Sequence, residues 1–275
     1  MELKFANKIT TFAHPIVMGI INCTPDSFFE DSRKQLQDEV LQLAEKHLKD
    51  GASILDLGAF STRPGIHFIS ESEELNRIKE PLKWITSEFP EAWISVDTFR
   101  ASIADFCLQN GAHIINDISG GQFDEQLLDV VSSYQSPYIV MHLQGTPETM
   151  HHDYVYGDIS QDVVHYFEKR IAHYHSKGIQ QLILDPGFGF SKSMNDNFRL
   201  LGHLEELKAL SFPVLAGVSR KRMIWKTLES SPEQALNGTT VLNTVALLKG
   251  ADILRVHDVR EAVETVRLIS QMYEG

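Results

Sequence analysis

The sequence has few of the features that mark secreted, membrane-spanning or nucleic-acid-binding proteins. Its 275 residues include two cysteines, Cys23 and Cys107, which form neither a CxxC pair nor a disulfide framework. No apolar run approaches the roughly 18 residues of a membrane span, and the N-terminus has no apolar core of signal-peptide length. Basic side chains are few relative to acidic ones, with 25 Lys and Arg and 37 Asp and Glu. The net charge of −12 argues against a nucleic-acid or anionic-membrane partner. We therefore expect a cytoplasmic protein with reduced thiols.

Glycine-rich phosphate loops of the GxGxxG or Walker type are also absent from the sequence, which disfavours an open nucleotide-binding sheet. What is present is an alternation of short apolar runs and longer amphipathic stretches. Most of the short runs are apolar on both faces, as buried parallel strands are. The predicted strands are Ile16–Ile21, Ser53–Leu57, Trp93–Val96, His113–Asn116, Tyr138–Met141, Leu182–Leu184, Val214–Ala216 and Ile253–Arg255.

The amphipathic stretches between these strands have helical spacing. They are Gln37–Lys49, Ile103–Leu108, Val163–His175, Phe198–Leu207, Thr240–Leu248 and Ala262–Met272. Eight strand–helix units in a chain of this length fit a closed barrel better than an open sheet, and no linker interrupts them. We predict an α/β fold, namely a single (β/α)8 TIM-type barrel with parallel strands, in which residues 1–275 form one domain.

Polar residues follow the end of every predicted strand. In a barrel of this type, residues at the C-terminal ends of the strands face the active site. In chain order they are Asn22, Asp56, Asp97, Asn116, His142, Asp185, Lys221 and Arg255 with His257. A lone Asp, Asn or Thr after a strand is often only a helix cap or turn former, and this alternative stays open for Thr98, Asp117 and Asp258. For the whole set, one convergent site is the better interpretation, because burying such groups unpaired would cost several kcal/mol each.

The side-chain chemistry of this set indicates a ligand with two different halves. One half of the set is cationic and suits phosphate oxygens: Arg63, Lys221, Arg255 and His257. The other half accepts hydrogen bonds and suits a flat heterocycle with several N–H donors: Asp56, Asp97, Asn116 and Asp185. Phe188 and Phe190 could lie against such a ring. We therefore expect a ligand with an electron-poor aromatic head and an anionic leaving group.

Eight blocks of sequence resemble, in order, the signatures of the dihydropteroate synthase family of pterin-binding enzymes. They are MGIINCTPDSF (18–28), DLGAFSTRPG (56–65), SVDT (95–98), NDISGG (116–121), MHLQGTPETM (141–150), DPGFGF (185–190), GVSRK (217–221) and RVHDV (255–259). The resemblance implies a barrel enzyme of folate biosynthesis, usually a homodimer and a sulfonamide target. It implies displacement of diphosphate from (7,8-dihydropterin-6-yl)methyl diphosphate by the amine of 4-aminobenzoate, through a pterin methylene cation.

The resemblance also implies roles for individual residues. The pterin-binding positions match Asp97, Asn116, Met141, Asp185, Phe190 and Lys221. The diphosphate-binding positions match Asn22, Arg63, Arg255 and His257, with Asn22 at a Mg2+ ion. The 4-aminobenzoate-binding positions match Phe28, Thr62, Arg63, Pro64 and Lys221, in the loops after the first two strands and after the seventh. The catalytic positions match Asp97, Lys221, Arg255 and His257.

The chain departs from the family pattern in the loops. Ala59 stands where the family usually has a second glycine, and Asp31-Ser32 stand where a glycine pair is common. Ser191 replaces a glycine after DPGFGF, and Asp196 replaces a histidine. These changes leave the predicted pterin and phosphate ligands intact. They keep open a second interpretation, a pterin-binding paralogue without catalytic activity, and a cobalamin-dependent pterin methyltransferase is a third.

Three further residue types carry weaker hypotheses. Cys23 is adjacent to Asn22 in the first strand block, so strand alternation turns it away from the site, and we predict a packing role. His142, His151 and His152 have no standard zinc spacing, and we expect His142 at the barrel rim near the substrate. Asp56 is expected to act mainly as an acceptor for the loop that follows it.

Overall fold

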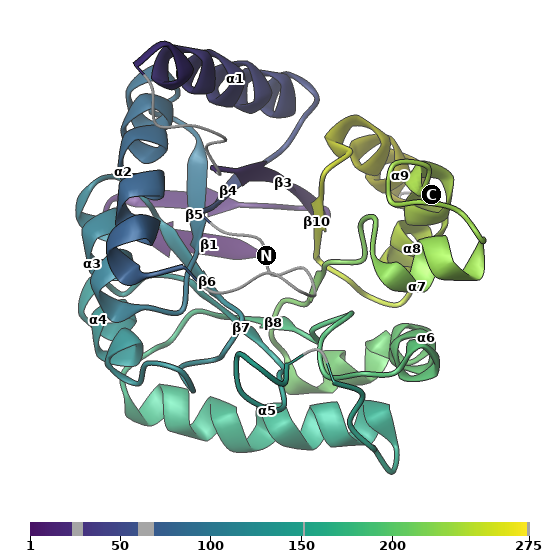
Figure 1. Ribbon diagram of the computed structural model, residues 1–275. Helices are drawn as coiled ribbons and strands as arrows, with labels where there is room; N and C mark the ends of the chain where they lie inside the picture. The colour runs from purple at the N-terminus through teal and green to yellow at the C-terminus, as the bar shows by residue number, and fades with distance from the viewer. Residues whose placement is uncertain (24–29, 60–68, 151, 274–275) are drawn as a thin grey trace.

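Eight parallel strands form a nearly closed barrel in the computed structural model, which describes residues 1–23, 30–59, 69–150 and 152–273 (Figure 1). The strands are β3 Ile16–Asn22, β4 Ile54–Gly58, β5 Trp93–Asp97, β6 Ile114–Asp117, β7 Tyr138–Met141, β8 Leu182–Asp185, β9 Leu215–Ala216 and β10 Ile253–Val256. Their order in the sheet is β8-β7-β6-β5-β4-β3-β10-β9. A parallel bridge between Leu184 and Val214 joins β8 to β9, so the two ends of the sheet meet. The predicted TIM-type barrel is confirmed.

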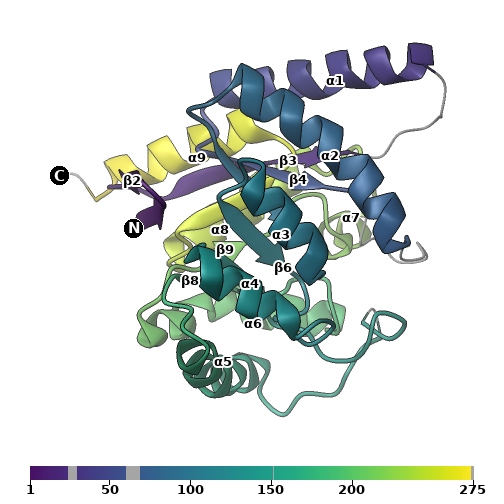
Figure 2. The same cartoon turned by 90° about the vertical axis from the view of Figure 1, so that its left-hand side faces the viewer.

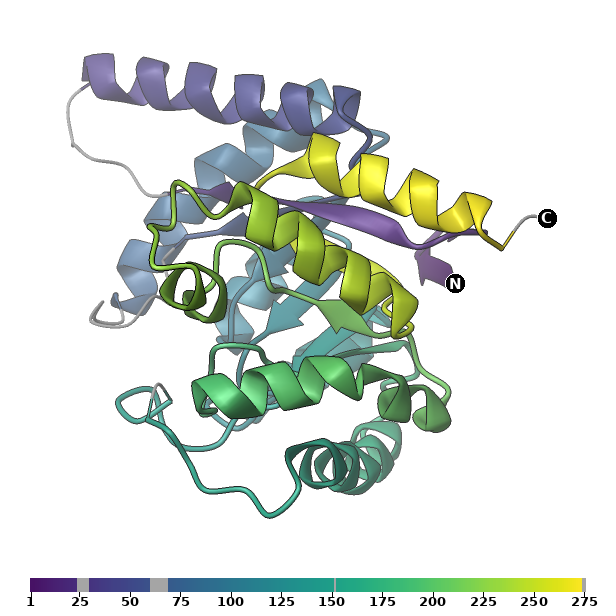
Figure 3. The same ribbon diagram turned by 90° about the vertical axis from the view of Figure 1, so that its right-hand side faces the viewer.

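Helices surround this barrel and cover the outer faces of the strands (Figures 2 and 3). They are α1 Glu30–Lys49, α2 Glu71–Glu88, α3 Ala101–Gln109, α4 Gln126–Tyr134, α5 Ile159–Ser176, α6 Met194–Gly202, α7 Arg222–Thr227, α8 Leu236–Leu248 and α9 Val259–Gln271, with a 3-10 segment at Leu204–Leu210. Outward-facing strand residues such as Leu55, Val96 and Val140 pack with the helices in one large core. Within the described part of the chain, no helix combines the length and apolar character needed to cross a bilayer.

The interior of the barrel begins with an apolar layer at the N-terminal ends of the strands. Every strand contributes to it through an inward-facing residue: Ile16, Met18, Ile54, Trp93, Ile114, Ile139, Ile183, Leu215 and Ile253. Because side chains alternate along a strand, the inward-facing residues above this layer lie two positions further on. The apolar layer therefore closes the lower half of the barrel, and the next layer decides the chemistry of the upper half.

A short antiparallel hairpin closes the bottom of the barrel. It consists of β1 Glu2–Phe5 and β2 Lys8–Thr11, and it lies at the end of the barrel where the strands begin (Figure 2). Leu3 is buried in the apolar layer with Phe5 against it. Trp93 Nε1 donates to Thr10 Oγ1 at 2.9 Å, which anchors the hairpin to β5. The hairpin thus shields the apolar layer from water and leaves only the opposite end open for a site.

The structure corrects several sequence-based element predictions. The hairpin and helices α2, α4 and α7 are not among the predicted elements, and the predicted helix Phe198–Leu207 is divided between α6 and the 3-10 segment. Helix α2 contains Pro81 but begins at a well-capped end, since Ser70 Oγ accepts from Glu73 N. The eight predicted strands each fall on an observed strand within a few residues. Buried strands have a strong local signal, whereas these elements depend on tertiary packing.

Candidate active site

The polar residues of the site form the layer directly above the apolar layer. In the pairing of β4 with β5, Ile54 lies opposite Trp93, Asp56 opposite Ser95 and Gly58 opposite Asp97. Asp56 is therefore the next inward-facing residue of β4 after Ile54, which belongs to the apolar layer. Asn116, Asp185 and Arg255 likewise each lie two residues after an apolar-layer residue of their own strand. Strand alternation alone thus gathers these groups at the C-terminal end of the barrel.

Arg255 is the centre of this layer because it joins two carboxylates from neighbouring strands. Its guanidinium donates to Asp56 Oδ2 through Nε at 2.7 Å, and Nη2 lies 2.6 Å from the same oxygen as an ion pair. Nη2 also donates to Asp97 Oδ2 at 3.0 Å. Asn116 Nδ2 adds a bond to Asp56 Oδ2 at 3.2 Å. Asp56 is fully buried, and these contacts bring charge and donors to its Oδ2, while its Oδ1 makes no hydrogen bond to the described part of the chain.

Asp97 lies at the upper edge of this network and retains capacity to accept a further hydrogen bond. Its Oδ1 atom is buried and makes no hydrogen bond to the described part of the chain. Burial raises the pKa of Asp97 to about 7, even though Arg255 acts in the opposite direction, and the charge of Asp56 adds to the rise. An unpaired buried acceptor of this kind is costly unless a ligand donor meets it.

A second group of residues surrounds the loop after β8. Asp185 Oδ1 accepts from Gly187 N at 2.7 Å, which fixes the carboxylate at the start of the loop. Lys221 Nζ donates to Phe188 O and lies 4.6 Å from the centroid of the Phe190 ring. Burial lowers the pKa of Lys221 to about 8, while the Asp185 carboxylate opposes this shift. Phe190 packs in a small apolar cluster with Met141.

The structure places an imidazole and an amide at the same end of the barrel. His257 follows β10, and its Nδ1 lies 3.0 Å from Ser219 Oγ, which also accepts from His257 N at 3.2 Å. These two contacts fix the ring against the loop after β9. Asn22 is the last residue of β3, and it is the exposed residue of an otherwise buried strand. The site therefore combines an acidic floor, formed by Asp56, Asp97 and Asp185, with cationic and amide groups at its mouth.

Comparisons with known proteins agree with this geometry. Residues 18–257 match the model of a family described as pterin binding enzyme. The chain is 39% identical over 271 residues to a dihydropteroate synthase of Escherichia coli, covering 98% of this chain and 95% of the relative. It superposes on a Yersinia pestis dihydropteroate synthase with a sulfonamide drug complex at a TM-score of 0.91 and 37% identity, covering 100% of this chain and 99% of that one.

The chain belongs to the dihydropteroate synthases, within the pterin-binding enzyme family. A Xanthomonas albilineans member of this family, solved with 4-aminobenzoic acid, matches at a TM-score of 0.90 and 34% identity over 99% of this chain and 98% of that one. Dihydropteroate synthases are transferases of folate biosynthesis. The match to dihydropteroate synthases over nearly the full length of both chains favours the synthase over the methyltransferase alternative that the sequence left open.

Most of the site residues predicted for this family and described by the structure lie at the barrel mouth. They are Asn22, Asp97, Asn116, Met141, Asp185, Phe190, Lys221, Arg255 and His257. Asp56 also lies there, and its described partners are Arg255 and Asn116 across the barrel. Its predicted role as an acceptor for the following loop concerns residues 60–68, which lie outside the described residues. The predicted 4-aminobenzoate residues Phe28, Thr62, Arg63 and Pro64 lie outside the described residues, as does His151.

Two aromatic predictions require correction. Phe188 is fully buried in the core between the barrel and the helices, so it cannot lie against a ligand in the barrel. His142 is 1% exposed and packs edge-on against Tyr166 of α5, with ring centroids 4.8 Å apart. It therefore faces the helix layer and not the rim, because it continues the outward-facing alternation of Tyr138 and Val140. Among the described residues, no group of three or more His, Cys, Asp or Glu could hold a metal ion.

Three strand-end residues and one cysteine have structural roles. Asp117 accepts from Ser119 N, Gly121 N and Tyr138 Oη and so forms the turn after β6. Thr98 Oγ1 donates to Glu74 of α2 at 2.6 Å. Asp258 makes no side-chain cap bond and instead pairs with Arg220 at 2.7 Å. Cys23 is fully buried in the core outside the barrel, which confirms its predicted packing role, and burial raises its pKa to about 12.

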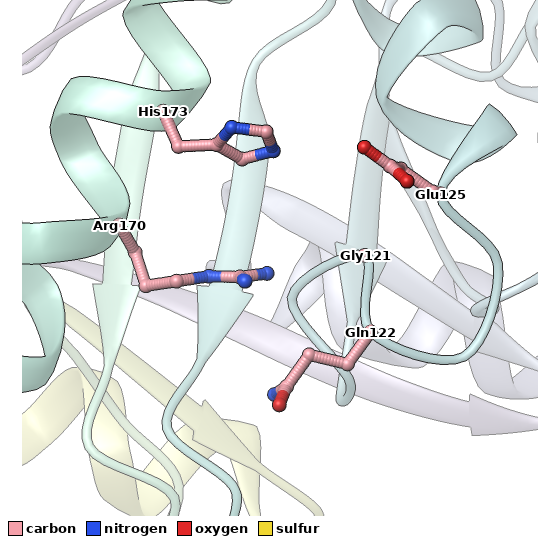
Figure 4. Close-up of a pocket in the computed structure, with 5 residues that line it drawn as sticks. All are labelled: Gly121, Gln122, Glu125, Arg170 and His173. Atoms are coloured by element: carbon pink, nitrogen blue, oxygen red, sulfur yellow. The ribbon is translucent and has the colours of Figure 1, made fainter.

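A separate depression of about 480 Å³ lies on the outer surface (Figure 4). Its lining residues come from α5 and from the segment between β6 and α4: Gly121, Gln122, Glu125, Arg170 and His173. Arg170 and His173 project from one helix toward the opposite wall, which carries Glu125 (Figure 4). None of these residues is among those predicted for the site. The depression belongs to the helix layer and not to the barrel mouth.

Sequence reasoning missed one buried cation beside the site. Lys192 is 5% exposed, and its Nζ donates to the carbonyl oxygens of Gly187, Phe190 and His142. Lysine is rarely buried to this extent without partners. Its position two residues after DPGFGF was the available signal, because a cation next to a glycine-rich turn can bind the carbonyls that the turn exposes.

Proposed function

We propose that residues 1–275 act as one pterin-binding barrel domain that condenses (7,8-dihydropterin-6-yl)methyl diphosphate with 4-aminobenzoate, giving 7,8-dihydropteroate and diphosphate. The observation that carries this proposal is the pairing of buried acceptors with cations at one barrel mouth. Asp97 and Asp185 offer oxygens to a ring with N–H donors, and Arg255 and His257 offer hydrogen-bond donors to a diphosphate. A ligand with both halves satisfies both groups at once.

The proposed pterin pocket is the part of the site where acceptors and apolar faces meet. The Oδ1 atom of Asp97 supports a role in accepting a ring N–H, because it is buried and makes no hydrogen bond to the described residues. Asn116 and Asp185 add donors and acceptors on either side. Met141 and Phe190 offer apolar faces for the ring to pack against. Lys221 adds a cation close to Phe190.

The proposed diphosphate site uses Arg255, His257, Asn22 and Arg63. Nε and Nη2 of Arg255 are engaged by Asp56 and Asp97, and the guanidinium also carries the two N–H donors of Nη1. His257 is held by Ser219 at the same mouth. Arg63 lies outside the described residues, and its role rests on the family resemblance.

The side chains at the mouth suit a Mg2+ ion that is bound mainly through the phosphates of the substrate. Such an ion usually keeps several waters and binds one or two protein groups together with substrate phosphates. Asn22 would offer its side-chain carbonyl oxygen at the mouth of the barrel, where it is exposed. When bound, Mg2+ would neutralise part of the diphosphate charge.

The proposed mechanism separates bond cleavage from bond formation. The C–O bond between the pterin methylene and the diphosphate breaks first, and the electron pair leaves on the diphosphate oxygen, where Arg255 and His257 stabilise the charge. The remaining methylene cation is conjugated with the pterin ring, and the ionised Asp97 carboxylate stabilises it. The amine nitrogen of 4-aminobenzoate then forms the C–N bond, and its proton passes to the departed diphosphate or to water. A covalent enzyme intermediate is not needed.

The outer surface supports the proposal that the protein forms a homodimer. Helix α8, with the sequence LNGTTVLNTVALL, has no charged residue. Val241 and Leu248 of α8 are 52% and 46% exposed, and Leu268 of the adjacent α9 is 71% exposed. The two helices lie side by side on one face (Figure 3). An uncharged helix with exposed apolar side chains is typical of a subunit interface.

Sedimentation equilibrium tests the dimer. The wild type should have twice the mass of the 31.1 kDa chain, and Val241→Glu should reduce it to the monomer mass. Ile9→Glu is the matched control, because Ile9 is 60% exposed on the hairpin and should leave the dimer intact. A monomeric wild type would contradict the proposed interface. We further propose that the enzyme acts in the cytoplasm, where the buried free thiols Cys23 and Cys107 would stay reduced.

Calorimetric binding tests the diphosphate site. Arg255→Ala should weaken the binding of the pterin diphosphate far more than the binding of the bare pterin, because the guanidinium contacts the diphosphate. Arg260→Ala is a suitable control, since the ion pair of Arg260 with Glu264 lies on the exposed face of α9. Equal loss for both ligands in Arg255→Ala would assign Arg255 to the fold and not to the diphosphate site.

A further inference from the structure

The loop after β8 has a backbone that brings carbonyl oxygens close together. Gly187 has a φ of +71°, and a Cβ atom at this position would lie 2.3 Å from the carbonyl oxygen of His142. The loop therefore passes directly against the end of β7. The carbonyls of Gly187, Phe190 and His142 converge on one point beneath the loop. Converging carbonyl dipoles repel each other unless a donor lies between them.

The Lys192 ammonium occupies this point. Nζ lies 3.0 Å from Gly187 O, 3.2 Å from Phe190 O and 3.4 Å from His142 O. An ammonium has three donors, so its hydrogen-bonding capacity matches the three carbonyls. The side chain is 5% exposed, so Lys192 is a buried residue that holds the loop from inside the protein.

The charged groups around Lys192 belong to the pterin pocket or border it. Burial lowers the pKa of Lys192 to about 7, the carboxylates of Asp185 and Asp196 act against this shift, and the Lys221 cation adds to it. The imidazole of His142 is a further titratable neighbour, and burial keeps its pKa well below the usual range. Lys192 therefore connects the ends of β7 and β8 electrostatically as well as through its hydrogen bonds.

The loop that Lys192 holds carries much of the pocket. Asp185 begins it, and Phe190 near its end packs with Met141. Lys221 reaches the loop from the next strand end and donates to Phe188 O. Asn197 supports the outer side, where its Oδ1 accepts from Gly189 N at 2.6 Å. A shift of this loop would move three of the proposed pterin contacts together: Asp185, Phe190 and Lys221.

We propose that Lys192 is a positioning residue, which gathers the carbonyls of Gly187, Phe190 and His142 so that Asp185, Phe190 and Lys221 stand in the arrangement that binds the pterin. This inference rests on the proposed function for the identity of the ligand. Lys192 itself touches no substrate. Its effect passes through the loop, and it should therefore influence the pterin half of the reaction and not the second substrate.

The test compares Lys192→Met and the milder Lys192→Gln with the control Lys169→Met, whose lysine is exposed on α5. Lys192→Met should raise KM and Kd for the pterin diphosphate by about tenfold or more, because small displacements of binding groups have large effects. Kd for the bare pterin should rise similarly, and KM for 4-aminobenzoate should change less than about twofold. Lys192→Gln should lie between, since its amide keeps two donors.

A purely structural role predicts a different result. It would lower the melting temperature and the yield of folded enzyme but leave both KM values unchanged, and that result would overturn the proposal. If Lys192→Met does not fold, Lys192→Gln decides on the same criterion. Should the wild type bind no pterin, the proposed function fails, and amide hydrogen exchange of residues 186–191 tests the loop separately. Faster exchange in the Lys192 variants than in Lys169→Met supports the positioning role, and unchanged exchange refutes it.

Discussion

Removal of the Arg255 guanidinium should show how much the acidic floor of the site depends on one cation. In Arg255→Met, Asp56 keeps only its bond from Asn116 among the contacts described, and Asp97 loses its Arg255 contact. Breaking a buried ion pair by removing one partner costs about 3–5 kcal/mol, because an uncompensated charge stays buried. For a chain of this size the corresponding fall in melting temperature is roughly 10 °C.

The stability lost in Arg255→Met should increase with pH. The folded-state pKa of Asp97 is raised from 3.8 to about 7, with burial as the main cause and Arg255 opposing it. A carboxyl whose pKa is raised on folding destabilises the fold progressively as pH rises from the unfolded value through the folded one. Without Arg255 the folded pKa moves higher still, so this cost continues to grow above pH 7. Arg255→Met should therefore lose more stability at pH 8 than at pH 5.

Urea denaturation followed by circular dichroism at pH 5 and pH 8 measures both effects. The double variant Arg255→Met/Asp56→Asn should be more stable at pH 8 than Arg255→Met alone, because the second change removes a carboxylate that has lost its cation. Arg260→Met is the matched control, since its ion pair with Glu264 is exposed and should contribute little. Equal losses at both pH values, with additive effects in the double variant, would show that Arg255 acts by packing alone.

The remaining predictions concern catalysis, the β8 loop and the order of binding. Asp97→Asn should lower the maximal rate by about 10²-fold or more, and the rise of kcat/KM with pH near 7 should disappear, because the ionised carboxylate is the active form. If only affinity changes, Asp97 does not stabilise the cation. Ser191 has a φ of +47°, so Ser191→Gly should be more stable than Ser191→Ala by about 1 kcal/mol in urea denaturation, and the reverse order would contradict the backbone geometry. A sulfonamide should give no heat on titration into the apo enzyme and a clear isotherm with pyrophosphate and Mg2+ present. Tight binding to the apo enzyme would exclude ordered binding.

The parts of the site that lie on strands could be predicted from the sequence because alternation is a local property. Asp97 and Asp185 are the last residues of β5 and β8, and Asn116 is the last but one residue of β6, so their position at the barrel mouth follows from counting along the strands. The same counting separates Cys23 from Asn22. These predictions needed no knowledge of which strands are neighbours.

What the sequence could not predict were contacts between residues that are far apart in the chain. Asp56 and Arg255 are separated by 199 residues in the sequence, so their pairing is visible only in the closed sheet. His142 directly follows β7, and because the outward-facing alternation of the strand continues through it, its ring is directed toward α5. Lys192 follows a helix-free turn with no periodic signal, and its partners are backbone carbonyls that sequence patterns do not reveal.

The measurement that tests the central claim most directly is turnover of the purified chain with the pterin diphosphate, 4-aminobenzoate and Mg2+. Dihydropteroate and diphosphate should form in equal amounts, and omission of 4-aminobenzoate or the change Arg255→Ala should abolish the formation of dihydropteroate. Binding of the pterin diphosphate without product under these conditions would contradict the account. It would identify the chain as a pterin-binding protein that has lost the transfer step.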